Sequence, residues 1–158
     1  GKVGPNSIVL HQNAAESFRG GIEVDADWKA TSRWEFLTSN SLSFNQIQQD
    51  GEVFKPVLTP SLLISCDVVY NISKSVYTGL NVRFNGKSYI DFSNEHQLPS
   101  YALLNIYGGV NWKGFLIKGS LNNVLNDLVL TNAVLGANSP LYFVMSGING
   151  SVSLTYKF

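Results

Sequence analysis

The feature that most constrains the fold of this chain is a period-two alternation of apolar and polar residues along most of its length. Successive side chains of a β-strand point to opposite faces, so this alternation predicts strands with one apolar and one polar face. The sequence offers no convincing helix, which would need an apolar period of 3.6 residues. Seven strands are expected, at residues 20–29, 33–45, 61–71, 76–85, 101–112, 115–123 and 144–158.

The connections between these strands alternate strictly in length. Residues 29–32, 71–75 and 113–114 form short connections, whereas residues 46–60, 86–100 and 124–143 form long ones. Transmembrane β-barrels have this asymmetry, with short turns on the periplasmic side and long loops outside. The chain is therefore expected to be all-β and to form an antiparallel transmembrane β-barrel or part of one.

Aromatic residues mark both ends of the expected strands. Those at the short-turn end are Trp28, Trp34, Tyr70, Tyr77, Trp112, Phe115, Tyr156 and Phe158. Those near the other end are Phe44, Phe84, Tyr101 and Phe143. Two such girdles around an apolar band are typical of a barrel in lipid. A strand over residues 102–112 would be about 33 Å long and, tilted by about 40°, would span about 25 Å, which matches the apolar band of such barrels.

Composition narrows the remaining classes. Charged residues make up 14% of the chain, against about 25% in ordinary soluble domains. Eleven basic side chains offset eleven acidic ones, which excludes a cationic nucleic-acid-binding module. Cys66 is the single cysteine, so an internal disulfide and a cysteine cluster for zinc are both excluded. A soluble β-sandwich that acts as a binding module remains an alternative, because its strands also alternate.

The last strand ends on a pattern of its own. Gly150 is followed by alternating hydrophobic residues that include Leu154 and Tyr156, and the chain stops at Phe158. This pattern resembles the signal by which outer-membrane barrels are recognised for assembly, and its position at the last residue makes the resemblance fairly specific.

Four further segments resemble motifs of TonB-dependent outer-membrane receptors, and they occur in the family's order. Residues 12–23 resemble the "Asn, short gap, Gly-hydrophobe-Glu" segment, and residues 58–60 resemble the Thr-Pro element that opens a strand. Residues 98–105 resemble the "Leu-Pro-x-Tyr…hydrophobe-Asn" strand start. Residues 120–127 resemble the "x-hydrophobe-x-Asn-Leu-hydrophobe-Asp" segment, with departures at Val124 and Asn126. The resemblance covers nearly the whole chain.

This resemblance implies a 22-stranded barrel with an N-terminal plug domain. Residues 1–158 would then be the C-terminal part of the barrel, with no plug in this chain, present as a proteolytic piece, a separate chain or one subunit of a split barrel. The family imports a scarce nutrient (a siderophore, cobalamin or glycan) across the outer membrane of Gram-negative bacteria. An inner-membrane TonB complex drives import through the TonB box and plug.

Implied partners are the remaining barrel strands and plug, outer-membrane lipid and lipopolysaccharide, and the barrel assembly machinery. No bond chemistry and no cofactor are expected, and no nucleic acid is an expected partner.

A second architecture avoids the unpaired edges of a seven-stranded sheet. If residues 8–12 form another strand, eight strands could close into an autonomous small outer-membrane barrel, whether adhesin, structural protein or lipid-modifying enzyme. Residues 13–19 would then be an outer loop, with both chain termini on the periplasmic side.

Candidate site residues follow from the barrel interpretation. The long loops would carry the ligand contacts, since binding residues gather on loops held by a rigid scaffold. The candidates there are Gln48, Phe54, Lys55, Lys87, Tyr89, Phe92 and His96. The polar face would line the lumen, where charged residues pair with one another or with the plug. The expected lumen residues are Glu23, Asp25, Asp27, Arg33, Glu35, Asp67, Arg83 and Lys118.

Catalytic and metal chemistry have little support in the sequence. His11 and His96 are the two histidines, and a pairing of His96 with a loop serine lacks a defined third group. The loops also offer too few clustered ligands for a metal site. Cys66 falls on the apolar face and is expected to act as a small hydrophobic residue facing lipid.

Overall fold

A computed structural model describes residues 2–3, 9–10, 16–136 and 139–158, and every regular element in that part of the chain is a β-strand. None of the described residues forms a helix with the length and hydropathy needed to cross a bilayer. The long strands are β3 (Glu16–Lys29), β4 (Trp34–Gln49), β6 (Leu62–Asn71), β7 (Val76–Asn85), β10 (Tyr101–Trp112), β11 (Phe115–Asn122) and β14 (Asn149–Tyr156). The short strands are β1 (Lys2–Val3), β2 (Val9–Leu10), β5 (Glu52–Phe54), β8 (Ser88–Tyr89), β9 (Gln97–Leu98), β12 (Leu130–Leu135) and β13 (Pro140–Val144).

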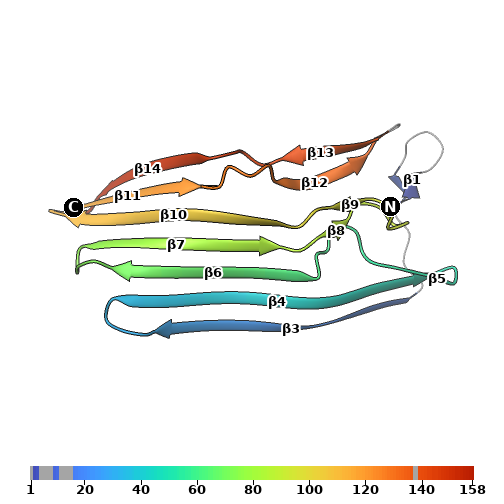
Figure 1. Ribbon diagram of the computed structural model, residues 1–158, viewed down its shortest axis with the longest axis horizontal. Coiled ribbons are helices and arrows are strands. Elements are labelled where there is room, and N and C mark those ends of the chain that lie inside the picture. Colours follow the sequence, from blue (N-terminus) through green and yellow to red (C-terminus); the bar gives the residue numbers. More distant parts are fainter. Residues whose placement is uncertain (1, 4–8, 11–15, 137–138) are drawn as a thin grey trace.

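The long strands form one antiparallel sheet in the order β14-β11-β10-β7-β6-β4-β3. Among the described residues, each long strand pairs with the long strands that come before and after it in sequence, and β4 also pairs with the short strand β5, so the sheet is an up-and-down meander (Figure 1). The three short turns and the C-terminus lie at one end of the sheet, and the long connections lie at the other. Among the described residues, β3 and β14 are edge strands with one side unpaired, so the sheet is open.

The expected strands are confirmed, two of them to the residue. Residues 76–85 and 101–112 coincide with β7 and β10, and 115–123 and 61–71 differ from β11 and β6 by one residue each. The first two strands are longer than expected, since β3 begins at Glu16 and β4 runs to Gln49. The last strand is shorter, because β14 runs only from Asn149 to Tyr156; Val144 ends β13, and residues 145–148 connect the two strands.

The register places apolar residues in continuous rows on one face of the sheet. One row runs across six strands through Trp28, Phe36, Val68, Leu80, Ile106 and Leu121. On the other face, a polar row runs through Asp27, Leu37, Asp67, Asn81 and Asn105. The two-faced sheet inferred from the alternation is therefore what forms.

Aromatic rings gather on the apolar face at the short-turn end. Trp34 lies between Tyr70, with ring centroids 4.6 Å apart, and Phe36, at 6.2 Å. The Tyr156 ring lies 4.7 Å from that of Phe115. These clusters form most of the expected girdle at this end of the strands, but Tyr77 lies on the polar face, in register with Gly109. At the other end Phe44 and Phe84 lie on the apolar face as expected, whereas Tyr101 lies on the polar face and Phe143 belongs to β13.

The apolar face has no second layer to cover it. Val24 on β3 is 51% exposed and Val152 on β14 is 82% exposed. A soluble β-sandwich would bury such residues against a second sheet, and the described part of the chain supplies none. The sandwich alternative is therefore not favoured.

The eight-stranded alternative is not favoured either. It requires residues 8–12 to pair with an edge of the main sheet. Val9–Leu10 instead pair with Lys2–Val3 in a separate two-stranded ribbon. The rest of that expected strand lies outside the described residues.

The long connections pack together in what we call the loop layer, residues 50–61, 86–100, 123–136 and 139–148. Its small core contains Ile90 and Leu98 from the second connection and Leu130 and Ala133 from β12. The first connection joins it through Leu58, whose amide donates to the Tyr89 carbonyl at 2.7 Å. The three connections therefore form one unit rather than three separate loops.

Candidate functional site

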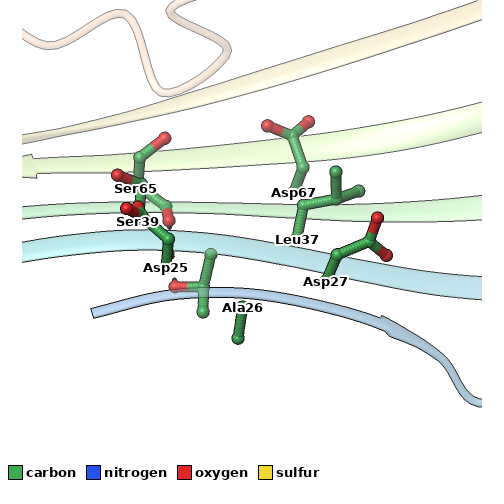
Figure 2. Close-up of a pocket in the computed structure, with 8 residues that line it drawn as sticks. Asp25, Ala26, Asp27, Leu37, Ser39, Ser65 and Asp67 are labelled. Carbon is green, nitrogen blue, oxygen red and sulfur yellow. Dashed lines mark hydrogen bonds between the residues drawn. The ribbon is translucent and has the colours of Figure 1, made fainter.

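The polar face carries three carboxylates in succession on the edge strand β3. Glu23, Asp25 and Asp27 all project from one face, are exposed, and have no ion-pair partner in the described structure. Asp25 and Asp27 line a shallow hollow of about 480 Å³ whose other wall includes Asp67 (Figure 2). The remaining lining residues are Ala26, Leu37, Thr38, Ser39 and Ser65, of which Ala26 and, by register, Thr38 lie on the opposite face. This hollow presents negative charge to whatever lies in front of it.

Asp67 differs from these residues because the sheet itself satisfies it. Its carboxylate accepts a hydrogen bond from Asn81 Nδ2 at 2.7 Å and another from the Tyr107 hydroxyl at 2.9 Å. Asn105 Nδ2 in turn donates to Asn81 Oδ1 at 3.1 Å. One network thus joins β6, β7 and β10 across the polar face.

Two tyrosines on this face lie over glycines of the neighbouring strand. Tyr107 pairs with Gly79, and Tyr77 pairs with Gly109. A Cβ atom added at Gly79 would lie 2.3 Å from the Tyr107 ring, and one at Gly109 would lie 2.6 Å from the Tyr77 ring. The absence of both side chains is therefore what lets each ring lie flat on the sheet and brings Tyr107 within reach of Asp67.

The other expected lumen residues have varied surroundings. Glu35 lies 3.6 Å from Lys29 Nζ, the one pairing of this set that the described residues show. Arg83 and Lys118 lie exposed on the polar face, and neither has an ion-pair partner in the described ranges. Arg33 lies in the turn that precedes β4 rather than on the strand.

Most of the expected ligand residues lie in or beside the loop layer. Phe54 on β5 meets Phe92 edge-on with centroids 5.6 Å apart. The backbone of Lys55 bonds in both directions with the Asn94 side chain, at 2.7 and 3.1 Å. Tyr89 lies in β8 and bridges to Val57. Gln48 and Lys87 are exposed, at the end of β4 and before β8.

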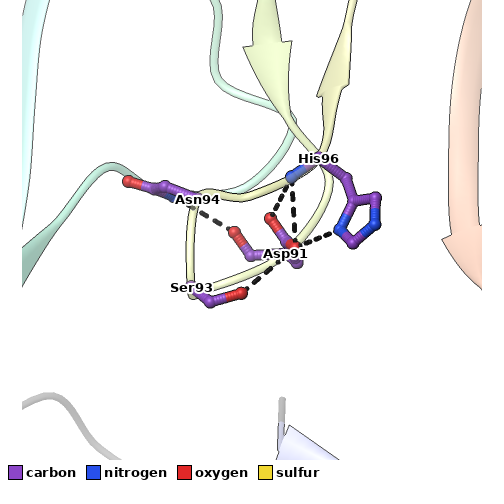
Figure 3. Close-up of polar contacts among 4 residues, drawn as sticks. All are labelled: Asp91, Ser93, Asn94 and His96. Carbon is purple, nitrogen blue, oxygen red and sulfur yellow. Dashed lines mark hydrogen bonds and ion pairs between the residues drawn. The ribbon is translucent and has the colours of Figure 1, made fainter.

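His96 belongs to a compact turn built around Asp91, a residue that the sequence did not single out (Figure 3). The His96 ring Nδ1 lies 2.7 Å from Asp91 Oδ2, and the backbone amide of His96 donates to the same carboxylate. Asp91 is buried, and Ser93 Oγ also donates to it. Burial would raise the pKa of Asp91, but the hydrogen bonds from His96 and Ser93 outweigh it and hold that pKa below its usual value of 3.8.

This turn lacks the arrangement of a nucleophilic triad. In such a triad the serine bonds the histidine, and the histidine bonds the carboxylate. Here Ser93 and His96 both donate to Asp91, so no proton path runs from the hydroxyl to the imidazole. Glu95 brings a carboxylate oxygen within 4.8 Å of Asp91 and His96 ligand atoms, but Asp91 already accepts bonds on both oxygens. The turn holds the loop in shape.

Asn123 fixes the loop layer to the sheet, and it too was missed as a site residue. It is 2% exposed and has a left-handed backbone conformation, with φ of 48°. Its backbone N–H donates to Asn105 Oδ1 at 3.0 Å, and its side-chain Nδ2 donates to the backbone carbonyls of Asp127 and Ser146. Its place in the 120–127 motif was the one signal available. No periodicity argument predicts a buried asparagine there.

The expected assembly residues lie on or just after β14. Leu154 and Tyr156 project from the apolar face of this edge strand, in register with Ile117 and Phe115. Gly150 pairs with Leu121 near the start of β14. Phe158 follows the strand fully exposed, with its ring 5.1 Å from Tyr156.

A comparison with protein-family models finds no match, and neither does a comparison with curated protein sequences. Solved structures do match. The ferric yersiniabactin uptake receptor FyuA from Yersinia pestis matches 92% of the chain with a TM-score of 0.78 and 18% identity. The siderophore receptor PiuA from Acinetobacter baumannii matches 90% with a TM-score of 0.74 and 16% identity. The ferric-catecholate import receptor Fiu from E. coli matches 87% with a TM-score of 0.71 and 13% identity.

The matched region is a small part of each of these proteins. The chain spans 22% of PiuA, 24% of FyuA and 20% of Fiu. A segment of a barrel wall is expected to be an open sheet with one apolar and one polar face, and this sheet matches a fifth to a quarter of each receptor. The chain therefore has the fold of one sector of a TonB-dependent receptor barrel.

Proposed function

We propose that this chain is the C-terminal sector of a TonB-dependent receptor that imports a ferric siderophore across the outer membrane. The observation that carries the proposal is the seven-stranded, two-faced sheet, which matches three ferric-chelate receptors over nearly its whole length. The apolar face meets lipid, the polar face lines the lumen, and the loop layer faces the outside. Cobalamin and glycans are the other nutrient classes that such a receptor takes.

Transport in this proposal is a binding and gating process without bond chemistry. The loop layer offers the first contact surface, with aromatic rings at Phe54 and Phe92 and cations at Lys55 and Lys87. A ferric siderophore is commonly an anionic chelate with apolar arms, so cations beside aromatics suit it. Energy then arrives from the TonB complex through the plug domain of the receptor.

The carboxylates of β3 face the plug in this proposal. Glu23, Asp25 and Asp27 lack counter-charges in the described sheet, and three like charges on one strand repel one another unless a cation faces them. A plug surface that bears arginine or lysine would supply that cation. The remaining barrel strands would pair with the free edges of β3 and β14, since lipid does not tolerate unpaired edges.

Assembly is proposed to use the last strand. The barrel assembly machinery would read Gly150, Leu154, Tyr156 and Phe158, which lie on or just after an edge strand whose second side is free in this sheet. Lipid and lipopolysaccharide would then cover the apolar face.

Uptake by the complete receptor tests the function. Cells that lack the receptor and cells that carry it are grown with little iron, and uptake of iron-55 bound to catecholate and to hydroxamate siderophores is followed. The expected result is receptor-dependent uptake of one chelate class that stops when TonB is deleted. Receptor-dependent uptake of cobalamin or a glycan instead would change the nutrient class. The proposal would be overturned if the receptor increased the uptake of none of these nutrients and growth did not depend on TonB.

A further inference from the structure

The apolar face of the sheet has a polar interruption on β4. By register, Thr38 lies between Ala26 on β3 and Cys66 on β6, and Asn40 lies between Val24 and Ile64. Thr38 and Asn40 therefore project into the apolar band. We call these two residues the polar patch.

The polar patch lies well inside the bilayer on the placement proposed above. Asn40 is six residues from Trp34 and four from Phe44, which mark the two aromatic levels on β4. At about 3.3 Å per residue and a tilt of about 40°, Asn40 lies about 15 Å from one level and about 10 Å from the other. Neither water nor lipid headgroups reach that depth.

The sheet satisfies only part of the hydrogen-bonding capacity of the polar patch. Thr38 Oγ1 donates to the Ser65 carbonyl at 3.1 Å, and Asn40 Nδ2 donates to Thr38 Oγ1 at 2.9 Å. An asparagine amide has two N–H donors and a carbonyl acceptor. The hydrogen bond to Thr38 is the one that the Asn40 side chain makes among the described residues, so its second N–H and its carbonyl have no protein partner there.

Another polar side chain on the same face shows the contrast. Thr78 on β7 donates its hydroxyl to the Tyr107 carbonyl at 3.1 Å, as Thr38 does to its own neighbouring strand. No amide lies next to Thr78, so its polar group is satisfied within the sheet. Unmet polar groups in the bilayer interior are costly and commonly face a partner.

We propose that the polar patch is a lateral docking site for a second copy of the receptor in the plane of the membrane. A twofold axis along the membrane normal would bring Asn40 of the two copies together, and an amide is complementary to itself because it both donates and accepts. A twofold interface places the same patch on both sides. The short side chains of Ala26 and Cys66 beside Thr38 let the two sheets approach closely, as small residues do between membrane helices.

This proposal rests on the outward placement of the apolar face, not on the nutrient that is imported. Cys66, which lies beside Thr38 in the register, reports that placement directly. In dilute bilayers where copies are separated, a lipid-soluble maleimide should label Cys66 of the complete receptor faster than a charged one. Faster labelling by the charged reagent would put Cys66 in water and remove both this inference and the barrel placement.

The association itself is measured on the complete receptor in lipid bilayers. Single-molecule photobleaching over a range of protein-to-lipid ratios gives the dimer dissociation constant. Asn40→Leu, which keeps a similar volume, should raise that constant about 3- to 10-fold, and Thr38→Val should raise it less. Thr78→Val is the matched control and should leave it unchanged. Heat-induced unfolding of each variant checks that the barrel still forms.

A receptor that stays monomeric at every density overturns the proposal, and so does an Asn40→Leu variant that dimerises as the wild type does. Cross-linking of the patch to a different membrane protein, with no cross-link between copies, would also overturn it. None of these three results affects siderophore uptake, so the proposed function is tested separately.

Discussion

At the scale of single residues, the surroundings of a carboxylate decide whether it hydrogen-bonds within the sheet or is left for a partner outside the sheet. Asp67 and Asp25 lie on the same polar face, yet only Asp67 has donors within reach, from Asn81 and Tyr107. Asp25 faces Ser39 across the register, and their side chains form no hydrogen bond with each other. The alternation predicts that both residues are polar-facing, but it cannot say which of them is satisfied.

Replacement of Asp67 by alanine should destabilise the barrel. Removing the carboxylate leaves the Tyr107 hydroxyl and the Asn81 amide without their acceptor, at a cost of about 1–3 kcal/mol. The measurement is the midpoint of heat-induced unfolding of the complete receptor in detergent. Asp25→Ala is the control and should lower that midpoint less than Asp67→Ala does, because it removes no hydrogen bond within the described sheet. Equal midpoints for Asp67→Ala and wild type would contradict the network.

At the scale of elements, the pairing of β7 with β10 depends on two glycines that make room for tyrosine rings. Gly79→Ala should destabilise the barrel by about 1–3 kcal/mol, because the new methyl group would overlap the Tyr107 ring. Gly119→Ala on β11 is the matched control, since its new Cβ would meet only a backbone oxygen 3.9 Å away. The same unfolding assay compares the two variants, and an unchanged midpoint for Gly79→Ala would show that Tyr107 can move aside at no cost.

The turn around Asp91 should lose order in acid. The folded-state pKa of Asp91 lies below 3.8, so its stabilising contribution is fully present above that value. The contribution falls as the pH drops through the folded-state pKa. Hydrogen exchange over residues 86–100, corrected for intrinsic rates, should therefore show lower protection near pH 3 than at pH 5. Asp91→Asn should lower protection at pH 5 and remove most of the difference in protection between pH 5 and pH 3. A wild-type loop that is equally protected at both pH values would contradict the prediction.

The elements that could be predicted from the sequence are those whose pattern is uninterrupted. Val76–Asn85 and Tyr101–Trp112 alternate cleanly between chain reversals, and both strands match the structure. Lys113 and Gly114 have φ of 47° and 85°, as expected for a two-residue hairpin turn. Local backbone preferences and side-chain alternation carry this information, so one sequence is enough to find it.

The elements that could not be predicted depend on contacts between distant segments. The β12–β13 hairpin lies where only a loop was expected, and Ala133 from it packs on Ile90 and Leu98. Asn123 is buried because it bonds to Asn105 on another strand. The hairpin that turns at Asp50-Gly51 was also not predicted, although it depends on local sequence, since Asp-Gly is itself a strong turn signal. It extends β4 into what was expected to be a loop.

At the scale of the whole molecule, the open sheet sets what residues 1–158 can do alone. Among the residues that the structure describes, β3 and β14 each have an unpaired side, so the isolated chain should not form a compact, heat-modifiable monomer in detergent. The complete receptor should show that behaviour when unheated and heated samples are compared by gel electrophoresis. A compact species at 17.3 kDa from the isolated chain would mean an autonomous barrel and would remove the transport claim.

The meander also bears on how barrels of different size arise. In the part of the chain that the structure describes, the long strands pair in the order in which they follow one another, so a gene segment encoding two long strands and their turn is a self-contained module. Duplication or loss of such a segment changes the circumference by two strands and leaves every other pairing intact, because no strand crosses over another. Barrel diameter is therefore a property that recombination can alter in steps, without redesign of the existing wall.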